Sequence, residues 1–398
     1  MVAAVPTEPS SDLPKGWHML RFPDALSEES FRVGKVKRSE YQPTGTYPVV
    51  DQGQGLIAGY WDDPRDVYDG TLPVVVFGDH TRAFKYVDFS FVCGADGTKV
   101  LVPDRDRFDP RFLYFALLGV PLPSRGYNRH FKLLREQVVP QPPLAEQRTI
   151  SHVLLAVQRA KEQTEQVIAA TREVKRGLLN TYFGHAQSVG SGEVSRWPQV
   201  ELRSLIAKPE YGYTASAVEK PVGPHLLRIT DIQDDRVVWE TVPFCECSPA
   251  DRQKFLLAPG DLLVARIGAT TGKTYLVHET PSDAVFASYL IRVRTLGRLD
   301  PRFLSYFTQS ASYWSQINAE KGGRLKQGVN TSTLTRLQLP CPDVDEQGRV
   351  VSTLEALDKK LEAERQRSEA LAVLFSSLLD DLMTGRLRVN HLLSTFAA

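Results

Sequence analysis

The sequence of 398 residues predicts an α+β chain in which two mixed α/β domains stand in tandem and each is followed by a long helix. Two observations support this prediction. The two halves repeat each other at their ends, and each half closes with a proline-free stretch whose apolar residues have helical spacing. The composition, with 42% hydrophobic and 24% charged residues, is that of an ordinary globular protein.

The repeat is strong at the ends of each half and weak in the middle. The segment from Asp109 reads DPRFLYF, and the segment from Asp300 reads DPRFLSYF. The stretch PQPPLAEQRTISHVLLAV ends at Val157 and recurs, 200 positions later, as PCPDVDEQGRVVSTLEAL, which ends at Leu357. We interpret the chain as a duplicated scaffold around two diverged middle segments. Asp followed by Pro at both copies of the first motif predicts the N-cap of a short helix.

The repeat and the Gly/Ser-rich stretch HAQSVGSGEVS predict seven regions along the chain. They are a disordered N-terminus 1–13, a first mixed domain 14–141, a long helix 142–184, a linker 185–195, a second mixed domain 196–341, a second long helix 342–386 and a tail 387–398.

Each long helix begins after a proline and is expected to end near a C-cap glycine, Gly184 or Gly385. A helix of about 38 residues is roughly 57 Å long, and its apolar stripe cannot be buried by the helix alone. We expect the two helices to pair as an antiparallel coiled coil, because a whole domain separates them. The alternative is that each helix packs on its own domain.

The stretch GDLLVARIGATTGKTYLV from Gly260 resembles a phosphate-binding loop but fails its requirements. Only three residues separate Gly268 from Gly272, and β-formers follow where a helix should begin. A hairpin with strands Leu262–Ile267 and Lys273–Val277 is predicted instead. The turn after Gly53 fails as a dinucleotide loop because Pro64 breaks the chain soon afterwards. We predict no catalytic residues in this chain.

The four cysteines, Cys93, Cys245, Cys247 and Cys341, show no ligand spacing with histidine, so no metal site is predicted. Sparse cysteine indicates a reduced, cytoplasmic protein. No signal peptide and no apolar run long enough to cross a bilayer is seen, so no membrane contact is expected.

Basic and aromatic residues alternate in several predicted loops, which is a pattern that suits contact with nucleic-acid phosphates and base edges. Their repetition in both halves favours function over ordinary charged surface. The candidate DNA-binding residues are His80, Thr81, Arg82, Lys85, Arg125, Tyr127, Arg129, Lys132, Tyr211, Tyr213, Thr214, Arg228, Arg266, Thr270, Thr271, Lys273, Arg324 and Lys326.

The doubled P-x-P-x-x-x-E-Q element, with Pro140, Pro142 and their counterparts Pro340 and Pro342, resembles the specificity (S) subunits of type I restriction–modification systems. The long helices that follow it carry the resemblance further, over about residues 13–388. One departure is that Gly348 stands where the first copy has Arg148.

The resemblance implies a non-catalytic subunit in which two target-recognition domains read a bipartite, gapped sequence in double-stranded DNA. It also implies docking of two methyltransferase (M) subunits and of restriction (R) subunits, which would carry S-adenosylmethionine and ATP for adenine methylation or cleavage. No cofactor is expected on this chain. The candidate docking or spacer residues are Glu146, Gln147, Ile150, Leu154, Val157, Glu346, Gln347, Val350, Leu354 and Leu357. The alternative is a coiled-coil scaffold without sequence-specific DNA binding.

Overall fold

The computed structural model describes residues 13–124, 126, 128–184, 197–233, 236–281, 283–321 and 328–389. Four candidate DNA-binding residues, Arg125, Tyr127, Arg324 and Lys326, lie outside the described residues, as does the predicted linker. The chain divides into two compact units. Unit 1 consists of the residues up to 165 together with those from 366 onward, and unit 2 consists of residues 166–365.

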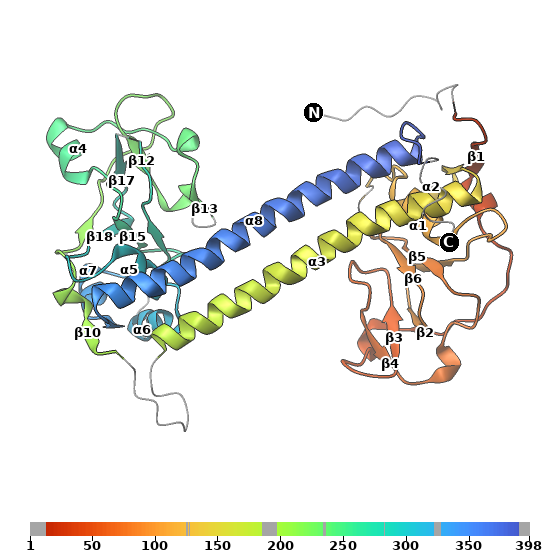
Figure 1. The fold of residues 1–398 in the computed structure, drawn as a ribbon, viewed down its shortest axis with the longest axis horizontal. Helices are drawn as coiled ribbons and strands as arrows, with labels where there is room; N and C mark the ends of the chain where they lie inside the picture. Colours follow the sequence, from red (N-terminus) through yellow and green to blue (C-terminus); the bar gives the residue numbers. More distant parts are fainter. Residues whose placement is uncertain are drawn as a thin grey trace. The chain divides into compact units, whose positions relative to one another are not determined.

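Two long helices belong partly to each unit (Figure 1): α3, Leu144–Phe183, and α8, Val344–Met383. Each unit therefore contains a mixed α/β region, the first half of the helix that follows that region, and the second half of the other long helix. The mixed α/β character that the sequence predicts is present. Gly385 follows α8 with φ +71°, a backbone conformation that favours glycine.

In its described residues, unit 1 contains small sheets and two short α-helices. A three-stranded antiparallel sheet has the order β6-β5-β8, a mixed sheet has the order β2-β7-β3-β4, and β1 pairs with β9. The elements are β1 His18–Arg21, β2 Lys35–Val36, β3 Tyr47–Val50, β4 Gly59–Trp61, β5 Val74–Gly78, β6 Phe84–Val87, β7 Val92–Gly94, β8 Thr98–Leu101, α1 Pro110–Leu118, α2 Phe131–Arg135 and β9 Val138–Gln141.

The main core of unit 1 is shared by both long helices. Ile150 and Leu154 of α3 are fully buried in it beside α1, and Leu382 near the end of α8 is buried in the same cluster. Phe375 of α8 packs on Phe115 of α1, with ring centroids 6.0 Å apart. Burial of such side chains contributes about 1.5–3 kcal/mol each, so the start of α3 and the end of α8 are both anchored in unit 1.

Unit 2 is built around the four-stranded antiparallel sheet β11-β18-β15-β16, beside which β12 pairs in parallel with β17. Further pairs join β10 to β19 and β13 to β14. The elements are β10 Gln199–Glu201, β11 Glu210–Tyr211, β12 His225–Leu227, β13 Ile232–Gln233, β14 Arg236–Val237, α4 Pro249–Phe255, β15 Leu262–Ala265, β16 Thr274–Leu276, β17 Ala284–Phe286, β18 Leu290–Val293, α5 Pro301–Phe307, α6 Ala311–Lys321, α7 Thr331–Thr335 and β19 Gln338–Pro340.

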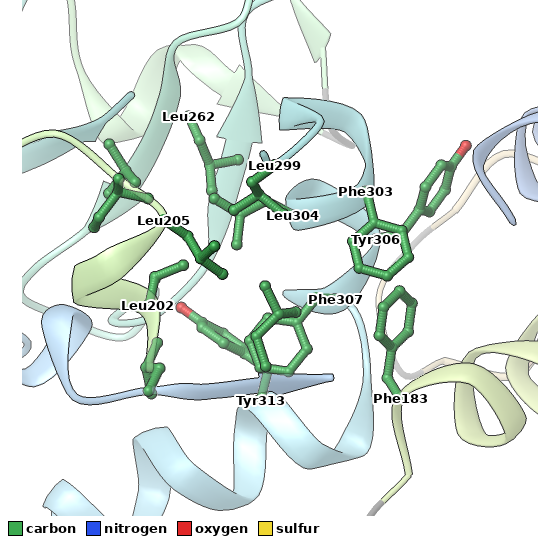
Figure 2. Packing of buried hydrophobic residues seen from close by; sticks show 14 of the residues in the cluster. Phe183, Leu202, Leu205, Leu262, Leu299, Phe303, Leu304, Tyr306, Phe307 and Tyr313 are labelled. Carbon is green, nitrogen blue, oxygen red and sulfur yellow. The ribbon is translucent and has the colours of Figure 1, made fainter. Parts of the chain in front are cut away.

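The core of unit 2 has the same plan (Figure 2). Phe183, the last residue of α3, lies edge-on against Phe303 of α5 with centroids 5.0 Å apart. Val350 and Leu354 of α8 are buried in this cluster. The beginning of each long helix therefore packs on the region that precedes it, as in the alternative weighed above, but the end of each helix packs in the other unit.

The hairpin predicted from Gly260 onward is confirmed, and its strands are shorter than predicted. β15 pairs antiparallel with β16, which places Leu262 opposite Leu276. Gly268 and Gly272 take φ +80° and +91°, so the turn between the strands needs glycine at both positions. A strand follows Lys273 where a phosphate-binding loop would start a helix, which removes the ATPase interpretation of this motif.

The two halves repeat one polar joint. Asp109 caps α1 and Asp300 caps α5, as predicted, by accepting from backbone N–H groups of the first turn. The Oε1 atoms of Gln147 and Gln347 accept from the backbone N–H of these aspartates at 2.8 and 2.9 Å. Both glutamines are fully buried, so each long helix is tied to its short helix by an internal hydrogen bond.

Candidate nucleic-acid interface

A partly exposed basic and aromatic cluster of unit 2 lies where β11, β15 and β18 meet. The Arg266 guanidinium carbon stands 4.6 Å from the centroid of the Tyr211 ring, a cation–π distance. Tyr211 is 39% exposed and Tyr289 57% exposed, and the Tyr289 carbonyl accepts from the Arg266 backbone N–H at 3.0 Å. We call these three residues the Tyr211–Arg266 surface.

The guanidinium of Arg266 makes few hydrogen bonds within the described part of the protein. Its Nη1 reaches the Ser288 carbonyl only at 3.4 Å, and its buried Nε has no hydrogen-bond partner among the described residues. The hydroxyl of Tyr211 accepts a long bond, 3.4 Å, from the Thr331 backbone N–H. A stacked arginine with unused N–H groups suits a phosphate oxygen or the O6 and N7 atoms of guanine.

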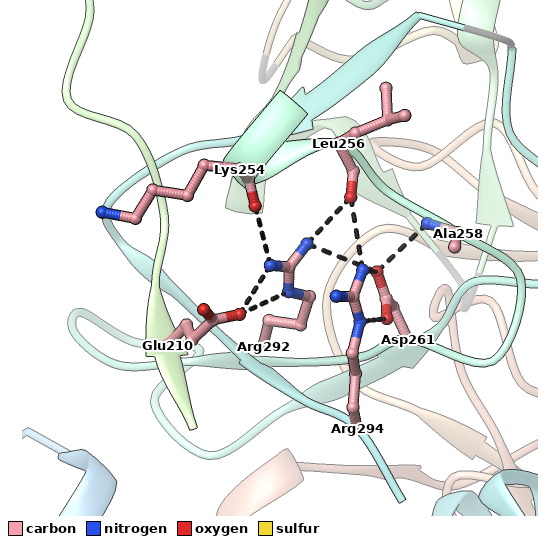
Figure 3. Close-up of polar contacts among 7 residues, drawn as sticks. All are labelled: Glu210, Lys254, Leu256, Ala258, Asp261, Arg292 and Arg294. Atoms are coloured by element: carbon pink, nitrogen blue, oxygen red, sulfur yellow. Dashed lines mark hydrogen bonds and ion pairs between the residues drawn. The ribbon is translucent and has the colours of Figure 1, made fainter. Parts of the chain in front are cut away.

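A buried arginine positions this surface (Figure 3). Arg292 on β18 is 2% exposed and donates to the Glu210 carboxylate at 2.6 Å and to the carbonyls of Lys254 and Leu256. Glu210 precedes Tyr211 on the two-residue edge strand β11. Since so short a strand has few ladder bonds of its own, the Arg292 bonds hold Tyr211 in place under Arg266.

Two polar partners keep the neighbouring loop in register with Arg292. Arg294 donates to Asp261 at 2.6 Å, and Asp261 in turn accepts from the Ala258 backbone N–H at 3.1 Å. Asp261 is 2% exposed, and its carboxylate also lies 3.7 Å from Arg292. The hydrogen bond to Asp261, more than any other contact, raises the pKa of Arg294 above its ordinary value. Both arginines are therefore structural cations and not free ligands for DNA.

The hairpin turn supplies one exposed cation and one misassigned residue. Lys273 is exposed and Thr270 is half-buried, in keeping with the contacts predicted for them. Thr271 is only 4% exposed, and its hydroxyl donates to the Gly268 carbonyl at 2.7 Å. The predicted DNA contact of Thr271 does not agree with this placement, because the hydroxyl stabilises the turn from inside.

The other candidates of unit 2 are mostly engaged within the protein. Arg228 makes a two-pronged bond with the Asp231 carboxylate, at 3.0 and 2.7 Å, and this bond raises the pKa of Arg228. The Tyr213 ring packs on Phe255 with centroids 5.5 Å apart. Thr214 is exposed. The structure does not bring these three residues into the Tyr211–Arg266 contact.

In unit 1, the turn after β5 is held by its own side chains. The Thr81 hydroxyl donates to the Gln52 carbonyl at 2.5 Å, and the His80 backbone N–H donates to the Gln52 side chain at 3.3 Å. Arg82, at φ +61°, donates through Nη1 to the Leu122 carbonyl at 2.7 Å. All three side chains remain half-buried, so this turn keeps a partly accessible polar edge.

Lys85 is an internal cation, which corrects its assignment to the interface. It is 5% exposed, and its Nζ donates to the Asp51 backbone carbonyl at 2.7 Å. Burial lowers the pKa of Lys85, and the Asp51 carboxylate at 3.5 Å opposes that shift. Arg129 and Lys132, by contrast, are exposed at the start of α2 and can meet a ligand from solvent.

Most of the predicted docking residues are internal, which corrects that set as well. Seven of them are at most 2% exposed and pack or hydrogen-bond within one unit: Glu146, Gln147, Ile150, Leu154, Gln347, Val350 and Leu354. The Glu146 carboxylate accepts from Trp17 Nε1 at 3.0 Å and from Arg388 at 2.6 Å.

The three remaining docking candidates are at least partly accessible. Glu346 is half-buried and pairs with Arg349 at 2.7 Å. Val157 and Leu357 are also half-buried. The repeat that singled out the whole docking set therefore reflects internal packing at most of its positions.

Sequence reasoning missed Tyr289 and Arg292. Tyr289 stands in ASYLIRV just before a buried strand, where its exposure depends on a turn that periodicity does not reveal. Arg292 alternates with apolar residues in that strand, and this position could have signalled a buried, paired cation. Among the described residues, no cluster of three or more metal-ligating side chains is present. No helix in the described part of the chain is long and apolar enough to cross a membrane.

Comparisons with known proteins show which family model, which characterised proteins and which solved structures this chain is similar to. Residues 246–372 match the family model described as type I restriction modification DNA specificity domain. The chain is 21% identical over 274 residues to the type I restriction enzyme MjaVIII specificity subunit of Methanocaldococcus jannaschii, covering 66% of this chain and 64% of that protein. It is 26% identical over 251 residues to the EcoKI specificity subunit of Escherichia coli K12, covering 59% and 53%.

The longest of these alignments, with the EcoR124I/EcoR124II specificity subunit of Escherichia coli, is 23% identical and covers 81% of this chain and 82% of that protein. Among solved structures, the S subunit of a type I restriction–modification system from M. genitalium superposes with a TM-score of 0.61 at 14% identity, covering 95% of this chain and 98% of that one. A second structure, from a study of type I R-M complex assembly, gives 0.56 at 16% identity, covering 94% of this chain and 100% of that one.

Proposed function

Because this chain belongs to the family of type I restriction–modification specificity subunits, we propose that it selects a bipartite, gapped sequence in double-stranded DNA. Each mixed α/β region would be a target-recognition domain that reads one half of the site. The observation that carries the proposal is the Tyr211–Arg266 surface, a half-buried arginine stacked on an exposed tyrosine, with its one side-chain hydrogen bond described here at 3.4 Å. Aromatic and arginine contacts of this kind recognise bases and phosphates.

The antiparallel pairing of α3 and α8 is part of this proposal. It is supported by the ion pair between Lys175 Nζ and Asp358 Oδ1 at 2.6 Å and by the burial of the end of each helix in the other unit's core. Such a pair would act as the spacer that sets the gap between the two half-sites. The polar sides of α3 and α8, which face solvent, would dock two methyltransferase subunits and the restriction subunits.

The chain itself is the specificity component and not the catalyst of such an enzyme. S-adenosylmethionine and ATP would be bound by the methyltransferase and restriction subunits, which would carry out adenine methylation or cleavage. The same proposal places this chain in the cytoplasm, where chromosomal and invading DNA would meet these subunits.

The first test is genome-wide methylation mapping of cells that express the neighbouring methyltransferase with and without this chain. A new gapped motif that appears only with the chain supports the proposal and reads out both half-sites. If a folded chain and an active methyltransferase produce no motif, the coiled-coil scaffold interpretation takes its place.

A second test assigns one half-site to unit 2. Arg266→Ala removes the stacked guanidinium and should relax the requirement at one base of a single half-site, at a cost of about 1–3 kcal/mol in discrimination. Arg298→Ala is the matched control, because Arg298 is an exposed cation of the same unit outside this surface. Equal relaxation of both half-sites would contradict independent recognition domains.

A further inference from the structure

Unit 2 contains a basic groove that the sequence did not reveal. The groove has a volume of about 740 Å³ and lies among α3, α8, α5 and β16. Its walls carry seven lysine and arginine side chains and only three carboxylates. Since all of these residues lie within unit 2, the groove is a feature of that unit alone.

The carboxylates of the groove are already paired. Asp358 pairs with Lys175 at 2.6 Å, Glu355 with Arg302 at 3.3 Å, and Glu362 with Arg236. Three further cations of the walls are exposed and have no carboxylate partner among the described residues: Arg172, Lys359 and Arg365. The groove therefore presents an excess of positive charge to solvent, on side chains that come from both long helices.

The other half of the repeat provides an internal control. Phe115 lies six residues after the capping aspartate of α1, and Tyr306 lies six residues after that of α5. Phe375 and Lys175 are likewise related by the offset of 200. In unit 1 this place holds the apolar contact between Phe115 and Phe375.

In unit 2 the same place is polar. Lys175 Nζ lies 5.3 Å from the Tyr306 ring, and the Tyr306 hydroxyl donates to Asp358 at 2.8 Å. An ion pair drawn partly out of water stabilises a fold less than good apolar packing does. In unit 1 the Phe115–Phe375 contact shows that apolar packing at this position is sufficient for folding. Folding therefore does not require the polar Lys175–Asp358–Tyr306 contacts of unit 2, and binding of a ligand can account for them.

We propose that this groove binds the phosphate backbone of the duplex whose bases the Tyr211–Arg266 surface reads, with Arg172, Lys359 and Arg365 as the phosphate contacts. This inference rests on the proposed function. β16 lines the groove at Thr274, next to Lys273 in the exposed hairpin turn, so groove and surface share one hairpin. Arginine and lysine are the phosphate ligands of DNA-binding proteins, and such contacts carry no sequence information.

The test measures the salt dependence of DNA binding by the chain in complex with its methyltransferase. The probes are a duplex with the motif found by methylation mapping and a scrambled duplex of equal length. Arg172→Gln with Lys359→Gln should reduce the slope of log K against log salt by about 2 and weaken binding to both duplexes by about tenfold or more at 0.1 M salt. Arg172→Lys with Lys359→Arg keeps the charges and should restore the slope.

Lys220→Gln with Arg298→Gln is the matched control, since it removes two exposed charges of unit 2 outside the groove and should leave the slope within about 0.5 of wild type. An unchanged slope in the groove variant, with a normal melting temperature, overturns the inference. So does a variant that no longer assembles with the methyltransferase and whose slope, measured on the chain alone, equals that of the wild-type chain alone; this result would assign the groove to an acidic partner segment. If the wild type does not distinguish the two duplexes but its slope still falls in the variant, the groove stands and the proposed function fails.

Discussion

The side-chain oxygen of Gln347 accepts a hydrogen bond from the backbone N–H of Asp300 at 2.9 Å, and this bond ties α8 to the cap of α5. The amide nitrogen of Gln347 donates to the carbonyls of Arg298 and Pro342 at 2.9 and 3.0 Å. Gln147 makes the same set of bonds in unit 1. The glutamine of the repeated Glu-Gln motif, predicted to dock a partner, is thus a buried amide that makes hydrogen bonds inside its own unit.

Gln347→Leu should destabilise unit 2 by on the order of 3 kcal/mol, because it leaves buried backbone groups without partners. Urea unfolding at pH 7.5 measures this loss. Gln309→Leu is the control, since Gln309 is exposed and should change the free energy of unfolding by less than about 0.5 kcal/mol. A loss of methyltransferase binding in a Gln347 variant of normal stability would restore the docking role.

Arg388→Ala should destabilise unit 1 by about 2 kcal/mol. The guanidinium binds the buried Glu146 carboxylate at 2.6 and 3.0 Å, and its removal deprives that buried carboxylate of both charge-assisted bonds. Differential scanning calorimetry of the full chain measures the change. Arg386→Ala, which removes an exposed pairing with Asp380 and Asp381, should cost less than about 1 kcal/mol. Equal effects of the two substitutions would contradict the role of Glu146 as a buried anchor.

Converting the polar contact of unit 2 into its unit 1 counterpart should leave the fold intact. Lys175→Phe with Asp358→Gln reproduces the residues at the matching positions, Phe375 and Gln158. We expect the free energy of unfolding to stay within about 1 kcal/mol of wild type, since apolar replacement of a partly buried ion pair is often neutral. Lys175→Phe alone should be less stable than the double variant, because it leaves the Asp358 carboxylate without its cation. If the free energy of unfolding of the double variant is more than about 2 kcal/mol below that of the wild type, the ion pair is needed for the fold.

Stability should fall as the pH rises above about 9. Burial raises the pKa of Cys93 to about 11 and the pKa values of Tyr41 and Tyr68 to about 12. In this range the folded chain keeps protons that the unfolded chain releases, so the free energy of unfolding decreases with pH. Burial lowers the pKa of Lys85, which acts in the opposite direction up to about pH 10.5, but the buried cysteines and tyrosines with raised pKa values, Cys245 among them, outnumber it.

Urea midpoints at pH 8 and pH 10 check this prediction. Tyr41→Phe with Tyr68→Phe removes two of these ionisations and should make the loss between these pH values smaller. Equal midpoints for the wild type at both pH values would contradict the burial assigned to these groups.

Local patterns were reliable wherever chemistry within a few residues decides the structure. The caps at Asp109 and Asp300 were predictable, because Asp before Pro satisfies the first N–H groups of a helix in any fold. The hairpin after Leu262 was predictable from the spacing of Gly268 and Gly272. The exposure of a side chain could not be predicted from local patterns. The sequence therefore places Lys85 and Thr271 at the interface, although both are buried.

The amino-acid sequence by itself determined the duplication, the long helices and their caps, since propensity, apolar spacing and capping act over one to four residues. Only the tertiary structure decided which repeated residues face inward, as Gln147 and Gln347 do. It also decided which cations have no carboxylate partner in the described part of the chain, as is the case for Arg172 and Lys359. Burial and ion pairing depend on segments more than 100 residues apart, such as Lys175 and Asp358. No local pattern records which of those segments meet.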